Sequence, residues 1–475
     1  MKITTGITGL DIILKGGFEK SFTYLIKGGP GSGKTLFGLQ FLIEGLKKGE
    51  KCVYISFDES VEEIVYQAKS FGWDVENIFF VDMLKELDIY SSDFIFLDYD
   101  SRTEIVEFID SITKLDVVEN ANRVFIDGIG TIKDIARDDA IYRRVLSSII
   151  QYLNSKGATT VVSCEKTKDI GKEIVSYVVS GEFSLESVKA NGRIFRILNV
   201  LKSRSDALIG NYYFDITNKG IVVYPIIPDI TLEKKDRFDY SKELITTGNA
   251  ELDSMLGGGI LKGSEVMISG KSGVGKTNLC LQILMQNDLK NVGIIYSFEE
   301  SKDVILQRYH DLFNYKPNNL IIKECEDLSS IGEFYWTVVD DLKHYNPSVV
   351  VIDPINLLSN LAITDEDVVK TIRLLKKIAK ATGIVLLVVV EVTQEIDVFH
   401  LTGIGVSQFA DYLIFGRYIE MEGELLKAIT VIKNRFGDHE RTFRILDMKS
   451  GEGLKIGKPL KEYSGLLSGK YEKVV

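Results

Sequence analysis

Gly28-Gly29-Pro30-Gly31-Ser32-Gly33-Lys34-Thr35 and Gly270-Lys271-Ser272-Gly273-Val274-Gly275-Lys276-Thr277 both fit the pattern G-x-x-x-x-G-K-[ST]. Such a loop curls so that its backbone N–H groups point at phosphate oxygens. Its lysine neutralises the β- and γ-phosphates, and the hydroxyl that follows ligates Mg²⁺. Each loop stands between a strand-like run and an amphipathic helix, so the sequence predicts two P-loop domains that bind ATP and Mg²⁺. The predicted nucleotide-binding residues are Gly28, Gly31, Ser32, Gly33, Lys34 and Thr35 in the first loop, and Gly270, Ser272, Gly273, Val274, Gly275, Lys276 and Thr277 in the second.

Length, charge and cysteine content set outer limits on the function. A chain of 475 residues is too long for one compact core. The net charge of −11 argues against nucleic acid as a partner, because proteins that hold duplexes usually have a basic surface. The four cysteines form no C-x-x-C pair and lie in or beside apolar runs, which is typical of reduced thiols in a cytoplasmic protein. Residues 2–6 lack the apolar region of a secretory signal, and the longest apolar run, 384–390, is too short to span a bilayer.

The two halves of the chain match beyond their loops. A similar lead, residues 5–17 and 247–259, precedes each loop, and stretches with apolar residues at helical spacing, 36–46 and 279–285, follow it. Further along, continuous Val/Ile runs alternate with charged helical stretches. This pattern predicts an α/β fold in which each domain is a mainly parallel sheet with helices on both faces. Active residues are then expected at the carboxyl ends of the strands.

The join between the halves carries two prolines, Pro225 and Pro228, followed by the charged stretch 232–237. Proline and charge together suit a linker between domains. The sequence therefore predicts an N-terminal ATPase domain over 1–228 and a C-terminal ATPase domain over 240–475, with a short polar tail.

A single aspartate ends an apolar strand in each half, at Asp127 and Asp353. P-loop ATPases place the acid that holds the Mg²⁺ water shell at this point. The predicted metal residues are these two aspartates with the loop threonines Thr35 and Thr277. The alternative is an aspartate that only caps the following turn.

Paired acids end an earlier strand in each half, Asp58-Glu59 and Glu299-Glu300. A carboxylate there can orient and deprotonate a water or a hydroxyl in line with the γ-phosphate. The alternative is a solvated pair at a strand end. One methylene moves a carboxylate by more than about 1 Å, and such a displacement can cost about a hundredfold in rate. We therefore predict that the first repeat turns ATP over more slowly and that Glu299 is the stronger base.

Near the end of each half, a strand carries two cations at positions i and i+2, Lys202 with Arg204 and Lys433 with Arg435. Residues at this spacing point to one side of a strand. The alternative, which either pair alone would favour, is an exposed basic edge of the sheet without a catalytic role. Their recurrence at matched places favours a catalytic role.

Together these features resemble the KaiC family of the RecA/DnaB superfamily over nearly the whole chain. The resemblance rests on the Leu-Asp…Gly-Gly lead, the two P-loops, the paired acids, the Lys-x-Arg strands and the closing Ser464-Gly465-Leu466-Leu467-Ser468-Gly469 patch. The chain looks like an archaeal double-domain relative rather than the cyanobacterial clock protein. The resemblance implies two tandem RecA-like domains, six subunits in a double ring with ATP between neighbours, and a role in signalling with regulatory protein partners.

The resemblance also implies roles for the singled-out residues. The first acid of each pair, Asp58 or Glu299, is the base. Lys202, Arg204, Lys433 and Arg435 reach the γ-phosphate of a neighbouring subunit, as arginine fingers do.

The clock protein phosphorylates itself on an adjacent Ser-Thr pair in its second domain. Aligning the spacing from Asp411 to Glu420 places Ser407-Gln408 on that pair, so the serine is kept and the threonine is lost. This departure puts an ordered two-site cycle in doubt. A single-site autokinase at Ser407 and an ordinary loop serine both stay open, and Thr402 and Ser301 are further hydroxyls that could reach the site.

The sequence thus predicts a cytoplasmic, ring-forming Mg²⁺-ATPase, with Ser/Thr autokinase or protein kinase activity as an added hypothesis. Hydrolysis would switch ring stability or partner binding. Two alternatives from other classes stay open. One is a motor on single-stranded nucleic acid, which predicts DNA-stimulated hydrolysis. The other is a nucleotide-sensing scaffold with negligible hydrolysis.

Overall fold

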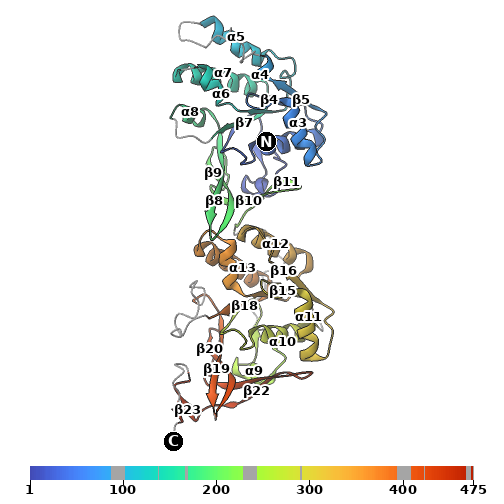
Figure 1. Ribbon diagram of the computed structural model, residues 1–475, viewed down its shortest axis with the longest axis vertical. Helices are drawn as coiled ribbons and strands as arrows, with labels where there is room; N and C mark the ends of the chain where they lie inside the picture. Colours follow the sequence, from blue (N-terminus) through green and yellow to red (C-terminus); the bar gives the residue numbers. More distant parts are fainter. Residues whose placement is uncertain are drawn as a thin grey trace. The chain divides into compact units, whose positions relative to one another are not determined.

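The computed structural model describes residues 1–86, 102–136, 138–165, 170–227, 243–288, 291–392, 408–421, 423–466 and 472–473. The chain divides into two compact units, Met1–Pro225 and Ile226–Val475, and each contains one P-loop (Figure 1). Most of the predicted linker lies outside the described residues. Within the described ranges no helix is both long and apolar enough to cross a bilayer.

The first unit is built on a nine-stranded sheet, which agrees with the predicted α/β fold. In sheet order its strands are β11 (Gly220–Tyr224), β10 (Gly210–Thr217), β9 (Arg193–Ser203), β8 (Gly181–Ala190), β3 (Thr23–Gly28), β7 (Thr159–Glu165), β6 (Arg123–Asp127), β4 (Cys52–Ser56) and β5 (Ile78–Asp82). Its helices are α1 (Leu10–Ile13), α2 (Lys34–Lys47), α3 (Val61–Ser70), α4 (Met83–Glu86), α5 (Arg102–Thr113), α6 (Thr131–Ala136), α7 (Asp139–Ser155) and α8 (Ile170–Val178), and β1 (Lys2–Ile3) pairs with β2 (Phe18–Glu19).

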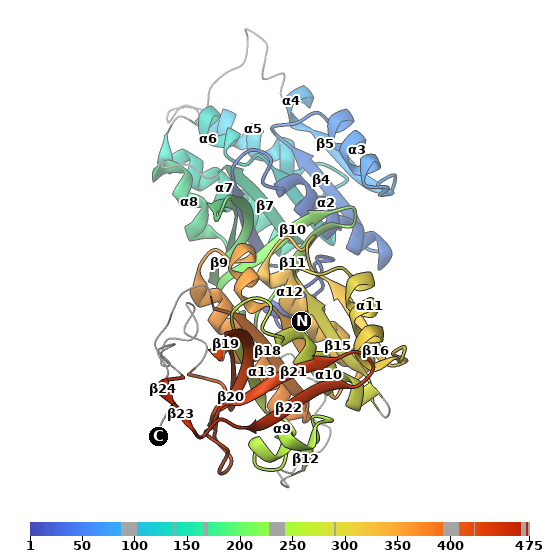
Figure 2. The same cartoon turned by 60° about the horizontal axis from the view of Figure 1, so that its bottom comes forward.

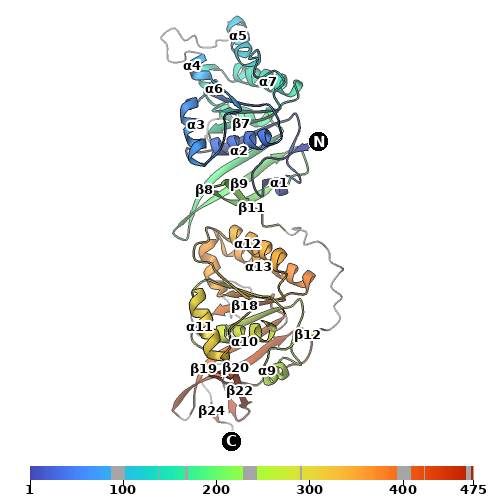
Figure 3. The same ribbon diagram turned by 90° about the vertical axis from the view of Figure 1, so that its right-hand side faces the viewer.

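Six of these strands, from β8 to β5 in sheet order, run parallel, and β9, β10 and β11 continue the sheet antiparallel. The parallel strands β3, β4, β6 and β7 are almost entirely buried, as strands covered on both faces must be. The helices α2 and α7 lie on opposite sides of β7 (Figure 3). The sequence analysis predicted the parallel part and missed the antiparallel ribbon.

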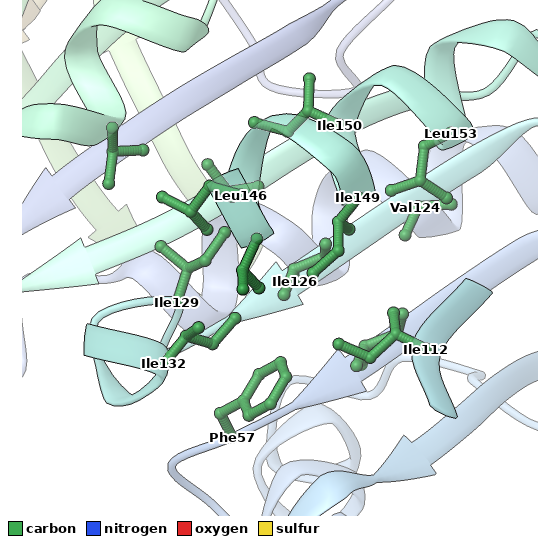
Figure 4. Close-up of a cluster of buried hydrophobic side chains, with 14 of the residues drawn as sticks. Phe57, Ile112, Val124, Ile126, Ile129, Ile132, Leu146, Ile149, Ile150 and Leu153 are labelled. Atoms are coloured by element: carbon green, nitrogen blue, oxygen red, sulfur yellow. The ribbon is translucent and has the colours of Figure 1, made fainter. Parts of the chain in front are cut away.

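Alternation along the strands explains how both faces are filled. On β6, Val124 and Ile126 face a cluster that includes Leu146 and Ile149 of α7 (Figure 4). Phe125 between them faces α2, where Gly38 makes room, because a Cβ there would lie 2.3 Å from the Phe125 ring. Val124, Phe125 and Ile126 must therefore all be apolar, because each face of the sheet is covered by a helix.

The second unit repeats this plan. In sheet order its strands are β16 (Leu320–Glu324), β15 (Gly293–Ser297), β17 (Val349–Asp353), β18 (Val385–Glu391), β14 (Glu265–Gly270), β19 (Tyr412–Met421), β20 (Glu424–Asn434), β21 (Arg444–Lys449) and β22 (Gly453–Pro459). Its helices are α9 (Ala250–Met255), α10 (Lys276–Asp288), α11 (Lys302–Phe313), α12 (Ile331–Tyr345) and α13 (Asp365–Thr382), with a 3₁₀ helix η1 (Ile355–Leu361), and the short pairs are β12 (Leu244–Ile245) with β13 (Ile260–Leu261) and β23 (Tyr463–Ser464) with β24 (Glu472–Lys473). Strands β20, β21 and β22 form the antiparallel part (Figure 2).

The two tandem RecA-like α/β domains are therefore confirmed. In each sheet the P-loop strand lies between the strand that ends in a glutamate and the strand that starts the antiparallel part. The carboxyl ends of the parallel strands share one edge, and the P-loops and both sets of acids follow those ends. This common edge positions the candidate sites.

Candidate nucleotide-binding sites

The P-loops join β3 to α2 and β14 to α10. Gly31 and Gly33 adopt φ values of 67° and 104°, and Gly273 and Gly275 adopt 74° and 111°. This left-handed backbone strains any residue with a Cβ, which explains the glycines. Because each helix begins at the lysine of its loop, the unpaired N–H groups of its first turn point toward the loop.

The first glycine of each loop permits a close backbone approach. A Cβ on Gly28 would lie 2.2 Å from Ser32 Oγ, and one on Gly270 would lie 2.4 Å from the Gly416 carbonyl oxygen. Val274 is buried and packs beside Gly416, so only its backbone can serve a ligand. The remaining predicted residues line two clefts: Gly31, Ser32, Gly33, Lys34 and Thr35 in the first, and Ser272, Gly273, Gly275, Lys276 and Thr277 in the second.

Both loop lysines lie across their own loops. Lys34 Nζ donates to the carbonyl oxygens of Gly28 and Gly29 at 3.0 and 3.1 Å, and Lys276 Nζ donates to that of Lys271 at 3.0 Å. Burial lowers the pKa of Lys276, and neighbouring acids oppose that shift. Each ammonium group is thus held where the pattern predicts the nucleotide phosphates.

The predicted metal residues meet in both units. Thr35 Oγ1 donates to Asp127 Oδ2 at 3.3 Å, and Thr277 Oγ1 donates to Asp353 Oδ2 at 2.7 Å. Burial raises the pKa of Asp353 to about 6, although the Thr277 hydrogen bond acts against it. Hydroxyl and carboxylate oxygens are ligands that suit Mg²⁺, and a divalent cation would neutralise this buried carboxylate. The residues present therefore fit the predicted metal.

The first acid pair lines the first cleft. Thr131 Oγ1 donates to Asp58 Oδ1 at 2.6 Å. The carboxylate also packs on Gly128 (φ 78°), where an added Cβ would lie 2.1 Å from Asp58 Cγ. Burial is the main cause that raises the pKa of Asp58, and the charges of Asp127 and Glu165 add to it, while the Thr131 hydrogen bond lowers it. Thus the first acid of this pair is engaged by a side chain of its own domain.

The second acid pair lines the second cleft and is held differently. Arg308 Nη2 donates to Glu300 Oε1 at 2.5 Å. In the described part of the chain, no side chain donates a hydrogen bond to the Glu299 carboxylate. Burial raises the pKa of Glu299, and the charge of Glu391 adds to the shift. In this cleft the second acid, Glu300, accepts a side-chain hydrogen bond, and among the described residues the first acid, Glu299, accepts none.

The Lys-x-Arg pairs lie away from these clefts. The strands end at Ser203 and Asn434, one residue before each arginine. The pairing continues through the arginines, because the N–H groups of Arg204 and Arg435 donate to the carbonyl oxygens of Ser180 and Asp411 at 2.9 and 3.0 Å. Lys202 Nζ donates to the carbonyl oxygens of Ser176 and Val179 at 2.6 and 2.9 Å.

In the second unit both cations meet one carbonyl. Lys433 Nζ and Arg435 Nη2 donate to the Gln408 carbonyl oxygen at 3.4 and 2.7 Å. The Arg435 guanidinium also lies 3.9 Å from Asp411 Oδ1. The candidate phosphoacceptor Ser407 and the alternative Thr402 lie outside the described residues. Ser301, the third hydroxyl, caps α11 by accepting from the Val304 N–H.

Sequence reasoning assigned no role to several cleft residues. Glu165 and Glu391 end β7 and β18 and line the two clefts. Both glutamates end equivalent strands in the two halves of the sequence, and this match could have identified them as site residues. Gln67, Arg308 and Thr131 gave no such signal, because nothing in the local pattern shows which acid each side chain faces.

Comparison with known proteins agrees with this geometry. The family model described as the KaiC ATPase matches residues 3–227 and 245–461. The circadian clock protein KaiC3 of Synechocystis sp. is 28% identical, over 98% of this chain and 94% of its own length. The circadian clock oscillator protein KaiC is 27% identical in Synechococcus elongatus, over 98% of this chain and 91% of its own, and 27% identical in Prochlorococcus marinus, over 100% and 94%. With a P-loop, a strand-end aspartate and an acid pair meeting in each of two repeats, the chain belongs to the KaiC family of ATPases.

Proposed function

We propose that this protein is a ring-forming Mg²⁺-ATPase in which the Lys-x-Arg pairs of one subunit complete the nucleotide sites of the next. ATP would bind at both P-loops, and its hydrolysis would change ring stability or the binding of regulatory protein partners. The observation that carries the proposal is the place of the Lys-x-Arg pairs in the sheets.

In both units the Lys-x-Arg pair lies near the amino end of the P-loop strand, whereas the P-loop follows the carboxyl end. The pair is therefore too far away to contact a nucleotide at its own P-loop. Ser203 pairs with Gly181, which pairs with Tyr24 near the start of β3. The loop follows Gly28 at the other end of that strand, four residues or roughly 13 Å farther along. The bonds of Lys202 to Ser176 and Val179 hold its ammonium group at the distant edge.

The second unit gives the same result. Asn434 pairs with Tyr412, which pairs with Val266 near the start of β14. The P-loop follows Gly270, again roughly 13 Å away along the strand. Since Arg435 is anchored at Gln408 and Asp411, a γ-phosphate that it contacts would belong to another copy of the chain.

Exposed apolar side chains flank both pairs and support the same assignment. Leu201 precedes Lys202 and is 52% exposed, and Phe436 follows Arg435 and is 52% exposed. Large apolar groups beside fixed cations suit a surface that a second copy covers. Side-by-side packing of this kind is head-to-tail, and it closes into a ring when the rotation permits.

The residues of each cleft would divide the reaction among them. The loop threonine and the strand-end aspartate would hold Mg²⁺, which would supply positive charge near the phosphates. The loop lysine would orient the γ-phosphate, and a carboxylate of the acid pair would take the proton of the attacking water. The neighbour's arginine would neutralise charge that develops in the transition state.

Kinase activity is part of the proposal, with Ser407 as the candidate acceptor. Lys433 and Arg435 bind the carbonyl of Gln408, the next residue in the sequence, and this contact supports the choice of Ser407 over the other candidate hydroxyls. Incubation with Mg²⁺ and γ-labelled ATP, followed by parallel counts of free phosphate and protein-bound label, tests it. Label that disappears in Ser407→Ala supports an autokinase, and free phosphate without bound label removes the kinase part.

Mixing two inactive variants tests the trans arrangement. Arg435→Ala loses the finger but keeps its cleft, and Glu299→Gln loses the base but keeps its finger. In a randomly mixed ring an intact cleft meets an intact finger at about a quarter of the interfaces, so an equal mixture should recover about a quarter of second-site activity. Both variants are studied with Lys34→Ala, which silences the first site. If the mixture stays as inactive as its components, the cations do not act across subunits.

The two alternatives make different predictions. A nucleic-acid motor requires hydrolysis that single-stranded DNA stimulates and salt suppresses. A nucleotide-sensing scaffold requires bound ATP without phosphate release. The label experiment, run with and without DNA, separates all three.

A further inference from the structure

The two acid pairs occupy equivalent places, yet opposite members are engaged. In the first unit Thr131 donates to Asp58, the first acid, at 2.6 Å. In the second unit Arg308 donates to Glu300, the second acid, at 2.5 Å. The two sites therefore differ in which carboxylate is left to act on a water.

The repeats carry different residues at each contact. Thr131 stands four residues after Asp127, and the residue four after Asp353 is Leu357, which has no hydroxyl to donate. The first site thus has a hydrogen bond to its first acid that the second site cannot form.

The reverse holds for the second acid. Arg308 stands eight residues after Glu300, and the residue eight after Glu59 is Gln67. Gln67 also lines the first cleft, but its Oε1 is buried without a hydrogen-bond partner among the described residues. No guanidinium therefore pairs with Glu59 at the place where Arg308 pairs with Glu300.

We propose that Thr131 and Arg308 are positioning residues that set the two sites to unequal activity. Thr131 restrains Asp58 and so restrains the first site, and Arg308 fixes Glu300 and so leaves Glu299 free to serve as base in the second. This inference rests on the proposed ATPase function and assigns its control to residues outside the P-loops.

A hydrogen bond donated to a carboxylate stabilises its charged form and makes it a weaker base. It also occupies Oδ1, so a water in line with the γ-phosphate would have to be held at Oδ2 or would have to compete with Thr131. The carboxylate packs against Gly128, where an added Cβ would lie 2.1 Å from Asp58 Cγ, so it has little room to turn away from Thr131.

Arg308 has the opposite consequence in the second site. Its guanidinium neutralises Glu300 and holds it by a charge-assisted hydrogen bond. Without this partner Glu300 would be an unpaired carboxylate close to Glu299, free to turn toward the place where Glu299 would hold the attacking water. Glu299 lies next to Lys276 and accepts no hydrogen bond from a described side chain, so its carboxylate is available to a water.

The test measures each site separately in the full-length chain. Lys276→Ala leaves the first site as the source of phosphate, and Lys34→Ala leaves the second. In the Lys276→Ala background, Thr131→Val should raise kcat roughly tenfold or more, the factor expected from the loss of one hydrogen bond to a carboxylate. Thr131→Ser keeps the hydroxyl and should keep the parent rate.

The dependence of first-site kcat on pH is a second measurement. A variant that had only lost structure would lower kcat without moving this profile along the pH axis. Because the Thr131 hydrogen bond lowers the pKa of Asp58, its removal should move the acidic limb of the first-site profile to higher pH. The second site is tested in the Lys34→Ala background. There Arg308→Gln introduces the residue found in the first site, and it should lower kcat at least tenfold with little change in KM. Arg308→Lys should recover part of the loss.

The outcomes separate this inference from the proposed function. A wild-type chain that releases no phosphate removes both. A wild-type chain that hydrolyses ATP, with first-site kcat and pH profile unmoved by Thr131→Val or with second-site kcat unmoved by Arg308→Gln, removes this inference and leaves the ATPase proposal standing.

Discussion

Glu265 at the start of β14 is fully buried, and replacing it should change how stability depends on pH. Its carboxylate lies 3.5 Å from Lys376 Nζ, which also binds Asp411 at 2.8 Å. Burial raises the pKa of Glu265 from 4.5 to about 7, with Lys376 acting against the shift and Asp411 adding to it. The folded chain therefore holds this proton more tightly than the unfolded chain does.

The sign and size of the effect follow from that difference. Between about pH 4.5 and 7 the folded state binds more protons, so the contribution of Glu265 to stability falls as pH rises and levels off above pH 7. The difference between a pKa of 4.5 and one of about 7 corresponds to about 3 kcal/mol. Glu265→Gln removes the titration, so the free energy of unfolding of the variant relative to its parent should rise by about 3 kcal/mol between pH 4.5 and 8.

Each unit contains one tryptophan, Trp73 in the first and Trp336 in the second, which allows a direct assay. In a Trp73→Phe background, urea unfolding followed by fluorescence reports on the second unit. Glu366→Gln, at an exposed position of α13, is the matched control, and its offset from the parent should not change with pH. An offset for Glu265→Gln that is constant from pH 4.5 to 8 would refute the reasoning, because burial would then have no effect on its protonation.

Three further predictions concern the first unit and the stoichiometry. Arg123 is fully buried and donates to the carbonyl oxygens of Thr4 and Phe41 at 2.8 and 2.9 Å, so Arg123→Met should cost about 2–4 kcal/mol of stability, measured by Trp73 fluorescence in urea. Gly128→Ala would push a methyl group into the Asp58 carboxylate, so it should abolish first-site hydrolysis while equilibrium dialysis still finds ATP bound. Lys276→Ala should lower bound ATP from about two to about one per chain in the same dialysis.

Much of the fold could be predicted from the sequence. Strands such as β6 and β17 are continuous apolar runs, and glycines occur where the loops need left-handed backbone, so local pattern alone indicates them. The prediction of a parallel sheet then placed both acid pairs and both strand-end aspartates at the edge where the P-loops lie. The antiparallel strands after β8 and β19 were missed, because β9 and β20 are each a run of buried residues with more exposed ends, and such a run does not reveal which neighbour it pairs with or in which direction.

The sequence by itself determined that there are two P-loops, which acids accompany them, and that the halves repeat. The tertiary structure decided which partners those acids have. Thr131 and Asp58 are 73 residues apart, and only the packing of β6 beside β4 brings the hydroxyl to the carboxylate. It also decided that the Lys-x-Arg pairs lie at the edge opposite their own loops, since strand direction depends on pairing across the sheet. Pattern specifies the local backbone, whereas contacts between distant residues depend on how the elements pack, and these contacts distinguish the two otherwise equivalent sites.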